Sequence, residues 1–127
     1  MSRRLAAVIG GRGVIGAAIV AALGGAGWDV IVGTHDRAAV ADGHRYADLG
    51  SEESLRRAVE GAEVVVQSAT FPTYPIERPR LGHTFDEFDG AGTERLVAAA
   101  SASGARRYLF VSGVGAGRGS ASPCFRA

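Results

Sequence analysis

Short apolar runs alternate with helix-periodic segments along this chain. The apolar runs at residues 5–9, 30–32, 64–66 and 108–111 are typical of strands that are buried on both faces of a parallel sheet. Residues 44–47 are predicted to add a further short strand. Between the strands, the spacing predicts helices over residues 14–23, 51–61 and 84–103, with a weak helical turn within residues 37–41.

Capping residues and apolar spacing define the predicted helices in more detail. Ser51 is a typical N-cap, and the stretch from Thr84 to Glu87 has the spacing of a capping box. The predicted inward faces are Val14, Ile15, Ala18, Ile19, Ala22 and Leu23; then Leu55, Ala58 and Val59; and then Phe88, Leu96, Val97 and Ala100. Prolines make residues 71–83 a loop, and the Gly/Ser-rich tail from about residue 113 is expected to be mobile.

The alternation of strands and helices predicts the fold. A strand–helix order of this kind implies right-handed crossovers and a parallel sheet with helices on both faces. We expect an α/β, three-layer Rossmann fold that forms one domain over residues 1–127, with about five strands in the order 3-2-1-4-5. The ligand cleft is expected at the carboxyl ends of the first and fourth strands, where the strand order reverses.

Composition narrows the classes of partner. The 127 residues are 46% hydrophobic and carry a net charge of +1, which argues against nucleic acid. No apolar stretch reaches the ~18 residues of a membrane span, so no membrane partner is expected. The lone cysteine, Cys124, excludes an internal disulfide and favours a reducing, cytoplasmic location. His35, His44 and His83 are far apart in the sequence, so no metal site is expected.

A glycine-rich turn joins the first strand to the first helix. Residues 8–16 read Val-Ile-Gly-Gly-Arg-Gly-Val-Ile-Gly, which satisfies both G-x-x-G-x-x-G and G-x-G-x-x-G. Such glycines permit a tight turn, admit a pyrophosphate and let the helix pack on the sheet, while free helix N–H groups face the phosphates. An ordinary tight turn is the alternative, but the flanking strand and helix favour a dinucleotide site. Its members are Gly10, Gly11, Arg12, Gly13, Val14, Ile15 and Gly16.

The residues after the second strand bear on which dinucleotide binds. An NAD site usually has Asp or Glu about 20 residues beyond the glycines to hold the ribose hydroxyls. Here Thr34 stands near that place, and Asp36 lies past the expected strand end. His35 and Arg37, together with Arg12, are placed to receive a 2′-phosphate. Each of these residues alone is more simply a solvated surface group, but together they favour NADP over NAD.

The chain also resembles a known enzyme family over nearly its whole length. The stretches that carry the resemblance are Ala-Asp-Leu at 47–49, Gly-Ala-Glu-Val-Val-Val at 61–66, Gly-Thr-Glu-Arg-Leu-Val-Ala-Ala-Ala at 92–100 and Gly-Ala-Arg-Arg-Tyr at 104–108. Their order and spacing are similar to those of the NAD-dependent epimerase/dehydratase family, which comprises extended and atypical short-chain dehydrogenases/reductases.

The resemblance implies roles for residues outside the glycine turn. Asp48 and Leu49 would lie beside the adenine, with Asp48 accepting a hydrogen bond from the adenine amino group. A turn-capping carboxylate is the other interpretation of Asp48. Ser68, Ala69 and Thr70 follow the fourth strand and would pass under the cofactor ribose, or simply form the exit from that strand.

The catalytic residues of the family are poorly matched. The resemblance implies a Ser or Thr after the fifth strand and a Tyr-x-x-x-Lys motif. Gly113 occupies the place of that hydroxyl, beside Ser112, and Cys124 occupies the place of the tyrosine. No lysine occurs in the chain. Ser112 and Cys124 are candidate catalytic residues, with a strand-end hydroxyl and a tail thiol as the other interpretations. Asp89 stands where relatives often have an Asn that supports the active site.

These observations together predict the function. We expect the amino-terminal, NAD(P)-binding domain of an epimerase/dehydratase-like oxidoreductase, truncated before the substrate region and without turnover of its own. The alternative is a non-catalytic NAD(P) sensor or a dimerising binding module that lacks the Tyr/Lys pair. A homodimer is an expected partner because a shortened sheet leaves an edge and helix faces uncovered.

Overall fold

The computed structural model describes residues 4–112 and Gly119, and the predictions for the tail and for Cys124 lie outside the described residues. The strands are β1 (Leu5–Ile9), β2 (Asp29–Thr34), β3 (Arg45–Tyr46), β4 (Val64–Gln67) and β5 (Arg107–Phe110). The α-helices are α1 (Val14–Gly25), α2 (Glu52–Ala58) and α3 (Gly92–Ala102). Two 3-10 turns, η1 (Arg37–Asp42) and η2 (Pro79–Leu81), and a π-helix, η3 (Phe85–Ala91), complete the elements.

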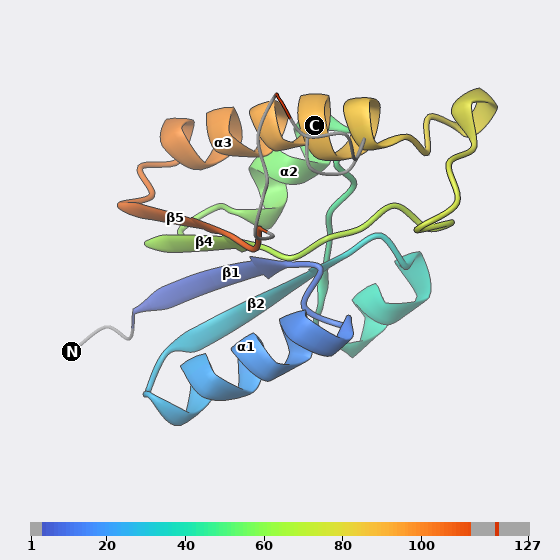
Figure 1. Cartoon of the computed structure of the whole chain (residues 1–127). Helices are drawn as coiled ribbons and strands as arrows, with labels where there is room; N and C mark the ends of the chain where they lie inside the picture. The colour runs from blue at the N-terminus through green and yellow to red at the C-terminus, as the bar shows by residue number, and fades with distance from the viewer. Residues whose placement is uncertain (1–3, 113–118, 120–127) are drawn as a thin grey trace.

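The strands form a parallel sheet in the order β3-β2-β1-β4-β5 (Figure 1). β1 is central, with Val8 beside Val32 of β2 on one side and Val66 of β4 on the other. The predicted α/β Rossmann fold and its strand order are therefore confirmed. The order reverses between β1 and β4, and the carboxyl ends of such a pair flank the cleft that open α/β sheets use for ligands.

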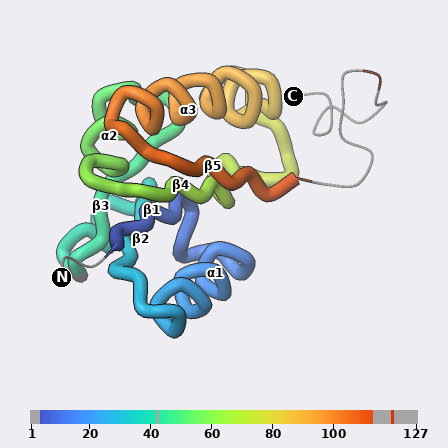
Figure 2. The backbone as a smooth tube through the Cα atoms, turned by 90° about the vertical axis from the view of Figure 1, so that its left-hand side faces the viewer, coloured from blue at the N-terminus to red at the C-terminus, as the bar shows by residue number. Residues whose placement is uncertain are grey.

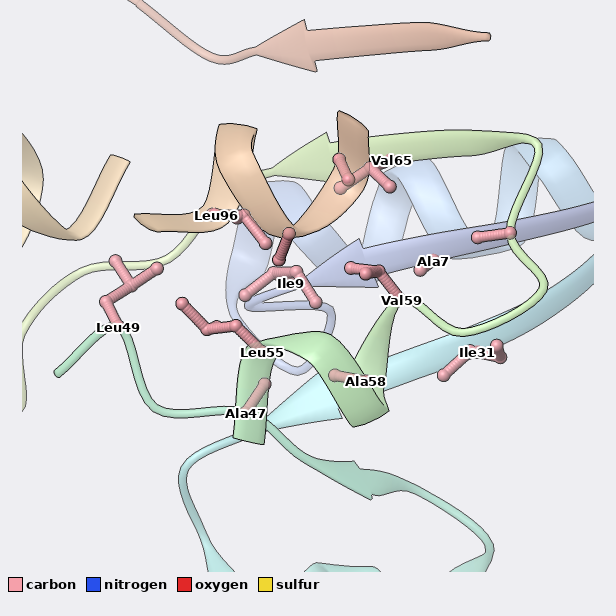
Figure 3. Packing of buried hydrophobic residues seen from close by; sticks show 13 residues of the cluster. Ala7, Ile9, Ile31, Ala47, Leu49, Leu55, Ala58, Val59, Val65 and Leu96 are labelled. Carbon is pink, nitrogen blue, oxygen red and sulfur yellow. The ribbon is translucent and has the colours of Figure 1, made fainter. Parts of the chain in front are cut away.

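Helices α2 and α3 cover one face of the sheet (Figures 1 and 2). Figure 3 shows Leu55 of α2, Leu96 of α3 and Ile9 of β1 gathered in one cluster, and each is at most 1% exposed. Full burial of one such side chain contributes about 1.5–3 kcal/mol. The inward face predicted for the segment after Ser51 is confirmed, since its members Leu55, Ala58 and Val59 are fully buried.

Helix α1 lies on the opposite face (Figure 2), and its predicted inward face is partly wrong. The residues that pack against β1 and β4 are Ile19, Val20 and Leu23. By contrast, Val14 is 93% and Ile15 55% exposed, and Ala18 and Ala22 are exposed as well. All residues of α1 are apolar or glycine, so helical periodicity alone does not single out the side that meets the sheet.

The single helix predicted over residues 84–103 is two helices in the structure. Thr84 caps the first, because its Oγ1 accepts a hydrogen bond from the Glu87 N–H at 3.1 Å, as the capping-box spacing predicts. The chain then winds as the π-helix η3 before α3 begins at Gly92. A Cβ on Gly92 would lie 2.8 Å from the Leu49 Cβ, so α3 approaches the loop after β3 closely.

The inward residues predicted for this helical segment are confirmed with one exception. Leu96 and Ala100 are buried, and Phe88 packs half-buried against the same cluster. Val97 is 44% exposed, because successive helical positions point ~100° apart and this residue turns away from the sheet.

The proline-containing segment between β4 and η3 is an ordered loop. Phe71 is 1% exposed and lies at its centre. Four other rings, those of Tyr74, His83, Phe85 and Phe88, have their centroids 5.0–6.3 Å from that of Phe71. Within the described part of the chain, no helix is long and apolar enough to cross a membrane.

Candidate nucleotide-binding site

The candidate site lies where the carboxyl ends of β1, β2 and β4 meet. An inner cavity of about 110 Å³ opens there. It brings together predicted residues from the glycine turn, the end of β2 and the segments after β3 and β4: Gly10, Arg12, Gly13, Thr34, His35, Leu49, Ser68, Ala69 and Thr70. The predicted turn residues Gly11, Val14, Ile15 and Gly16 do not line this cavity.

Two glycines of the turn are required by the fold itself. Gly10 has φ +88°, and a Cβ there would lie 2.6 Å from the backbone N of Ala69. A Cβ on Gly16 would lie 2.1 Å from the Gly10 carbonyl oxygen. Neither position accepts a side chain without a backbone shift, so both hold β1, α1 and the strand exit after β4 in close contact.

Gly13 is different, because the fold does not exclude a side chain there. Its φ is −70°, which any residue adopts. The nearest atom to an added Cβ is the Gly10 carbonyl oxygen at 3.5 Å, an ordinary contact. At Gly11, by contrast, a Cβ would come within 2.9 Å of the Val32 side chain. Gly13 therefore leaves open space that lines the inner cavity.

The start of helix α1 faces the same space without a capping side chain. Gly13 is the N-cap residue, and it provides no side-chain hydrogen bond to the first turn. That turn also contains no acidic residue. Backbone N–H groups at a helix start, together with the helix dipole, favour a bound anion.

Charged side chains crowd the end of β2. Arg12 Nη1 lies 2.7 Å from Asp36 Oδ2, and both side chains are about half exposed. The hydrogen bond from Arg12, followed by that from the Ala38 N–H, lowers the pKa of Asp36. Arg37 stacks its guanidinium over the ring of Tyr46, with 4.0 Å from Cζ to the ring centroid. Arg12 is thus paired with Asp36.

Asp48 was interpreted either as an adenine contact or as a turn-capping carboxylate, and in the structure its side chain caps a turn. Its Oδ1 accepts a hydrogen bond from the Gly50 N–H at 2.8 Å, and its Oδ2 accepts one from the Tyr46 hydroxyl at 3.3 Å. A carboxylate offers about four lone-pair sites. The side chain can therefore still accept a hydrogen bond from a ligand.

A second, outer cavity of about 360 Å³ adjoins the inner one, and no pattern in the sequence indicates it. Its walls come from the ends of β2 and β3, the loop after β3, the loop before η3 and η3 itself. The lining residues include His35, Tyr46, Asp48, His83, Glu87 and Phe88. Phe88, predicted only as a core residue, lines both cavities.

The polar side chains between β4, β5 and α3 form hydrogen bonds with one another. Tyr108 donates its hydroxyl hydrogen to Gln67 Oε1, and Gln67 Nε2 donates to Thr93 Oγ1 at 2.8 Å. Burial raises the pKa of Tyr108. Ser112 is exposed after β5 and lines neither cavity. Asp89 Oδ2 is buried without a hydrogen-bond partner in the described part of the chain, and burial raises the pKa of this carboxyl to about 6.

Solved structures of other proteins resemble this chain in fold and sequence. A short-chain dehydrogenase/reductase superfamily protein from Agrobacterium tumefaciens, with bound NAD, is 30% identical with a TM-score of 0.70, over 86% of this chain and 32% of that one. UDP-glucose 4-epimerase from Thermus thermophilus, in complex with NAD, is 27% identical with a TM-score of 0.68, over 88% of this chain and 38% of that one.

A more distant structure shares the fold. UDP-glucose 4-epimerase from Thermotoga maritima, with UDP-glucose, is 22% identical with a TM-score of 0.71, over 88% of this chain and 38% of that one. The chain thus spans about a third of the length of the solved structures that it matches. No protein of curated function matches it.

The sequence profile of one family covers most of the chain. It matches residues 6–122 and describes the NAD dependent epimerase/dehydratase family. The strand order, the glycine turn after β1 and the structural matches agree with that profile. The chain belongs to the NAD-dependent epimerase/dehydratase family.

Proposed function

We propose that this chain binds a nicotinamide dinucleotide with the diphosphate against the glycine turn. The observation that carries the proposal is Gly13, which the fold does not need and which leaves open space beside the uncapped start of α1. A diphosphate fits this space, because it needs close backbone approach and free N–H groups. The bound NAD of the Agrobacterium and Thermus proteins supports the same class of ligand.

The preferred form in this proposal is NADP. Arg12, His35 and Arg37 surround the end of β2, where the 2′-phosphate of NADP would lie. Asp36 opposes this preference, since its carboxylate repels a phosphate and accepts a hydrogen bond from a ribose hydroxyl. The phosphate carries more charge than the Asp36 carboxylate and is the stronger partner for Arg12.

The remaining contacts follow from the position of the turn. Asp48 and Leu49 would meet the adenine end of the dinucleotide, while Ser68, Ala69 and Thr70 would lie under its ribose. These residues line the inner or the outer cavity, at the carboxyl ends of the strands near the point between β1 and β4 where the strand order reverses.

Titration calorimetry with NAD, NADH, NADP and NADPH tests the proposal. The expected result is binding, with the phosphorylated forms binding more tightly. Arg12→Ala is expected to weaken NADPH about tenfold or more, because it removes a charged hydrogen bond. Asp36→Asn is expected to widen the preference for NADPH over NADH. Absence of binding by every dinucleotide would reject the proposal, and tighter NADH binding would reject the NADP preference alone.

A non-catalytic role as an NAD(P) sensor or a dimerising binding module is the second candidate. It is favoured by Cys124, which occupies the place of the family's tyrosine in this sequence. Two of the tyrosine hydroxyls are also engaged elsewhere, that of Tyr46 with Asp48 and that of Tyr108 with Gln67. The expected result is dinucleotide binding without hydride transfer to added sugar nucleotides or carbonyl compounds. Turnover well above background, followed by nicotinamide absorbance, would rule this candidate out.

A further inference from the structure

Arg95 lies outside both cavities but contacts one lining residue of each. It stands near the start of α3, where its Nη1 donates a hydrogen bond to the Leu49 carbonyl oxygen at 3.1 Å. Its Nη2 lies 3.0 Å from Glu87 Oε1 of η3. Leu49 lines the inner cavity and Glu87 the outer one, whereas Arg95 lines neither. The fixed fork of a guanidinium suits such a double contact.

The peptide unit between Leu49 and Gly50 is held at both of its polar groups. Arg95 binds the carbonyl oxygen, and the N–H donates to Asp48 Oδ1 at 2.8 Å. One chain of hydrogen bonds thus runs from the Arg95 guanidinium through the peptide unit to the Asp48 carboxylate. Bonds in such a chain polarise and strengthen one another.

Packing fixes the side chain of Leu49 but does not select the direction of its carbonyl group. Leu49 is 1% exposed and belongs to the core cluster (Figure 3), and α3 begins directly against it at Gly92. The next residue, Gly50, has no Cβ, so the backbone there tolerates more than one orientation of the peptide unit. The hydrogen bond from Arg95 therefore selects the orientation in which the Gly50 N–H meets Asp48.

Glu87 holds the guanidinium of Arg95 in place. The Glu87 N–H donates to Thr84 Oγ1 at 3.1 Å, so the backbone of Glu87 is anchored at the start of η3. The side chains of Arg95 and Glu87 are 32% and 54% exposed, and an ion pair of that exposure adds little stability by itself. Its effect is to restrict Arg95 to the rotamer that reaches Leu49.

We propose that Arg95 is a positioning residue of the dinucleotide site. It orients the Leu49–Gly50 peptide unit, which in turn orients the Asp48 carboxylate toward the ligand. This inference rests on the proposed function, in which Asp48 meets the adenine end of the dinucleotide. It adds a residue that touches no ligand and makes affinity depend on the contact between α3, η3 and the loop after β3.

Calorimetry of NADPH with Arg95→Met tests the inference. Methionine keeps a long apolar stem but has no N–H donors, so the variant is expected to weaken NADPH about tenfold, the effect of one lost hydrogen bond. Arg57→Met is the matched control, because Arg57 also forms an exposed ion pair, with Glu53 at 2.8 Å, and lines neither cavity. The control is expected to bind NADPH as the unaltered chain does.

Arg95→Lys is measured alongside. It keeps the positive charge but not the planar fork, and it is expected to weaken NADPH by about threefold or more. This variant gives the same test should Arg95→Met fail to fold.

A double-mutant cycle separates positioning from a merely structural role. Asp48→Asn keeps an oxygen for the Gly50 N–H but replaces the other carboxylate oxygen with an amide NH₂ group. Because Arg95 acts through Asp48, Arg95→Met is expected to change NADPH affinity by less than about twofold in the Asp48→Asn background. Losses that multiply in the double variant would show that Arg95 acts independently of Asp48 and would overturn the inference.

The NMR signal of the Gly50 amide gives a readout that needs no ligand. Arg95→Met is expected to shift this signal and to speed its hydrogen exchange, while Arg57→Met leaves both unchanged. The inference is overturned if the Gly50 signal stays in place in Arg95→Met, or if the Arg95 variants bind NADPH as the control does. If the unaltered chain binds no dinucleotide, the proposed function fails and the inference falls with it.

Discussion

The carboxyl group of Asp89 makes the stability of this chain depend on pH. Asp89 Oδ2 is buried in η3 without a hydrogen-bond partner in the described part of the chain, and burial raises the pKa of this group from 3.8 to about 6. The folded state therefore holds its proton more tightly than the unfolded state. Protonation of Asp89 therefore stabilises the folded state. This stabilisation is complete below pH 3.8, the pKa in the unfolded chain, and is lost as the pH rises through about 6.

The expected magnitude follows from the size of the shift. Two pKa units correspond to about 3 kcal/mol in full. Asp89 keeps some contact with solvent, so screening reduces this value. Part of this stability is already lost below pH 5, where Asp89 begins to ionise. About 1 kcal/mol of unfolding free energy is therefore lost between pH 5 and pH 8.

Urea unfolding, followed by the fluorescence of the single tryptophan, Trp28, measures this loss. The unaltered chain is expected to lose about 1 kcal/mol between pH 5 and pH 8. Asp89→Asn should lose none of it, because the ionisation is gone. Asp86→Asn serves as the matched control, since Asp86 is exposed in the same π-helix. A pH profile for Asp89→Asn identical to that of the unaltered chain would refute the reasoning.

Three further substitutions test contacts that stabilise the fold, each by chemical denaturation. Gly16→Ala is expected to cost about 2–4 kcal/mol or prevent folding, because the new Cβ would lie 2.1 Å from the Gly10 carbonyl oxygen. Arg45→Met should cost about 1–2 kcal/mol, since the guanidinium caps carbonyls at the end of α2. Tyr108→Phe should cost about 1–3 kcal/mol by leaving Gln67 Oε1 unpaired. Losses below about 0.5 kcal/mol would contradict the assigned contacts.

The sheet could be predicted from the sequence because its signals are local. Each of the apolar runs in β1, β2 and β4 is short, and helix-periodic segments lie between successive strands. A parallel arrangement follows, because each crossover has room for a helix. The glycine turn could be placed for the same reason, since it lies between one such strand and one such helix.

The side on which α1 packs could not be predicted. The helix contains only apolar residues and glycine, so its sequence is compatible with more than one inward face. Contacts with β1 and β4 select Ile19, Val20 and Leu23. Val14 and Ile15 remain exposed because they lie at the helix start, beside the turn.

The site depends on contacts between residues that are distant in sequence. The sequence predicts Arg12 as a cofactor residue and puts Asp36 past the end of the second strand, but it does not predict their ion pair, which joins positions 24 residues apart. The outer cavity exists because Phe71 anchors the loop that brings His83 to Phe88 and Tyr46. Neither hydrophobic periodicity nor a sequence motif predicts these contacts between distant segments. The α-helical period likewise does not show that residues 85–91 form a π-helix.

The structure gives the contacts behind the separate roles of the glycines. The motif gives the first glycine to a tight turn, the middle one to the pyrophosphate and the last to helix packing. In the structure, an added Cβ would clash with the backbone at both Gly10 and Gly16. At Gly13 packing does not exclude a side chain, and the proposed function accounts for this glycine by the space that a diphosphate needs.

Binding of NADPH to Gly13→Val, measured by calorimetry, therefore tests the central claim most directly. Gly24→Val is the matched control, since a Cβ at Gly24 of α1 meets nothing within 4 Å. Both variants are expected to fold. The account predicts that Gly24→Val binds NADPH as the unaltered chain does and that Gly13→Val binds none. Undiminished affinity in Gly13→Val would contradict it.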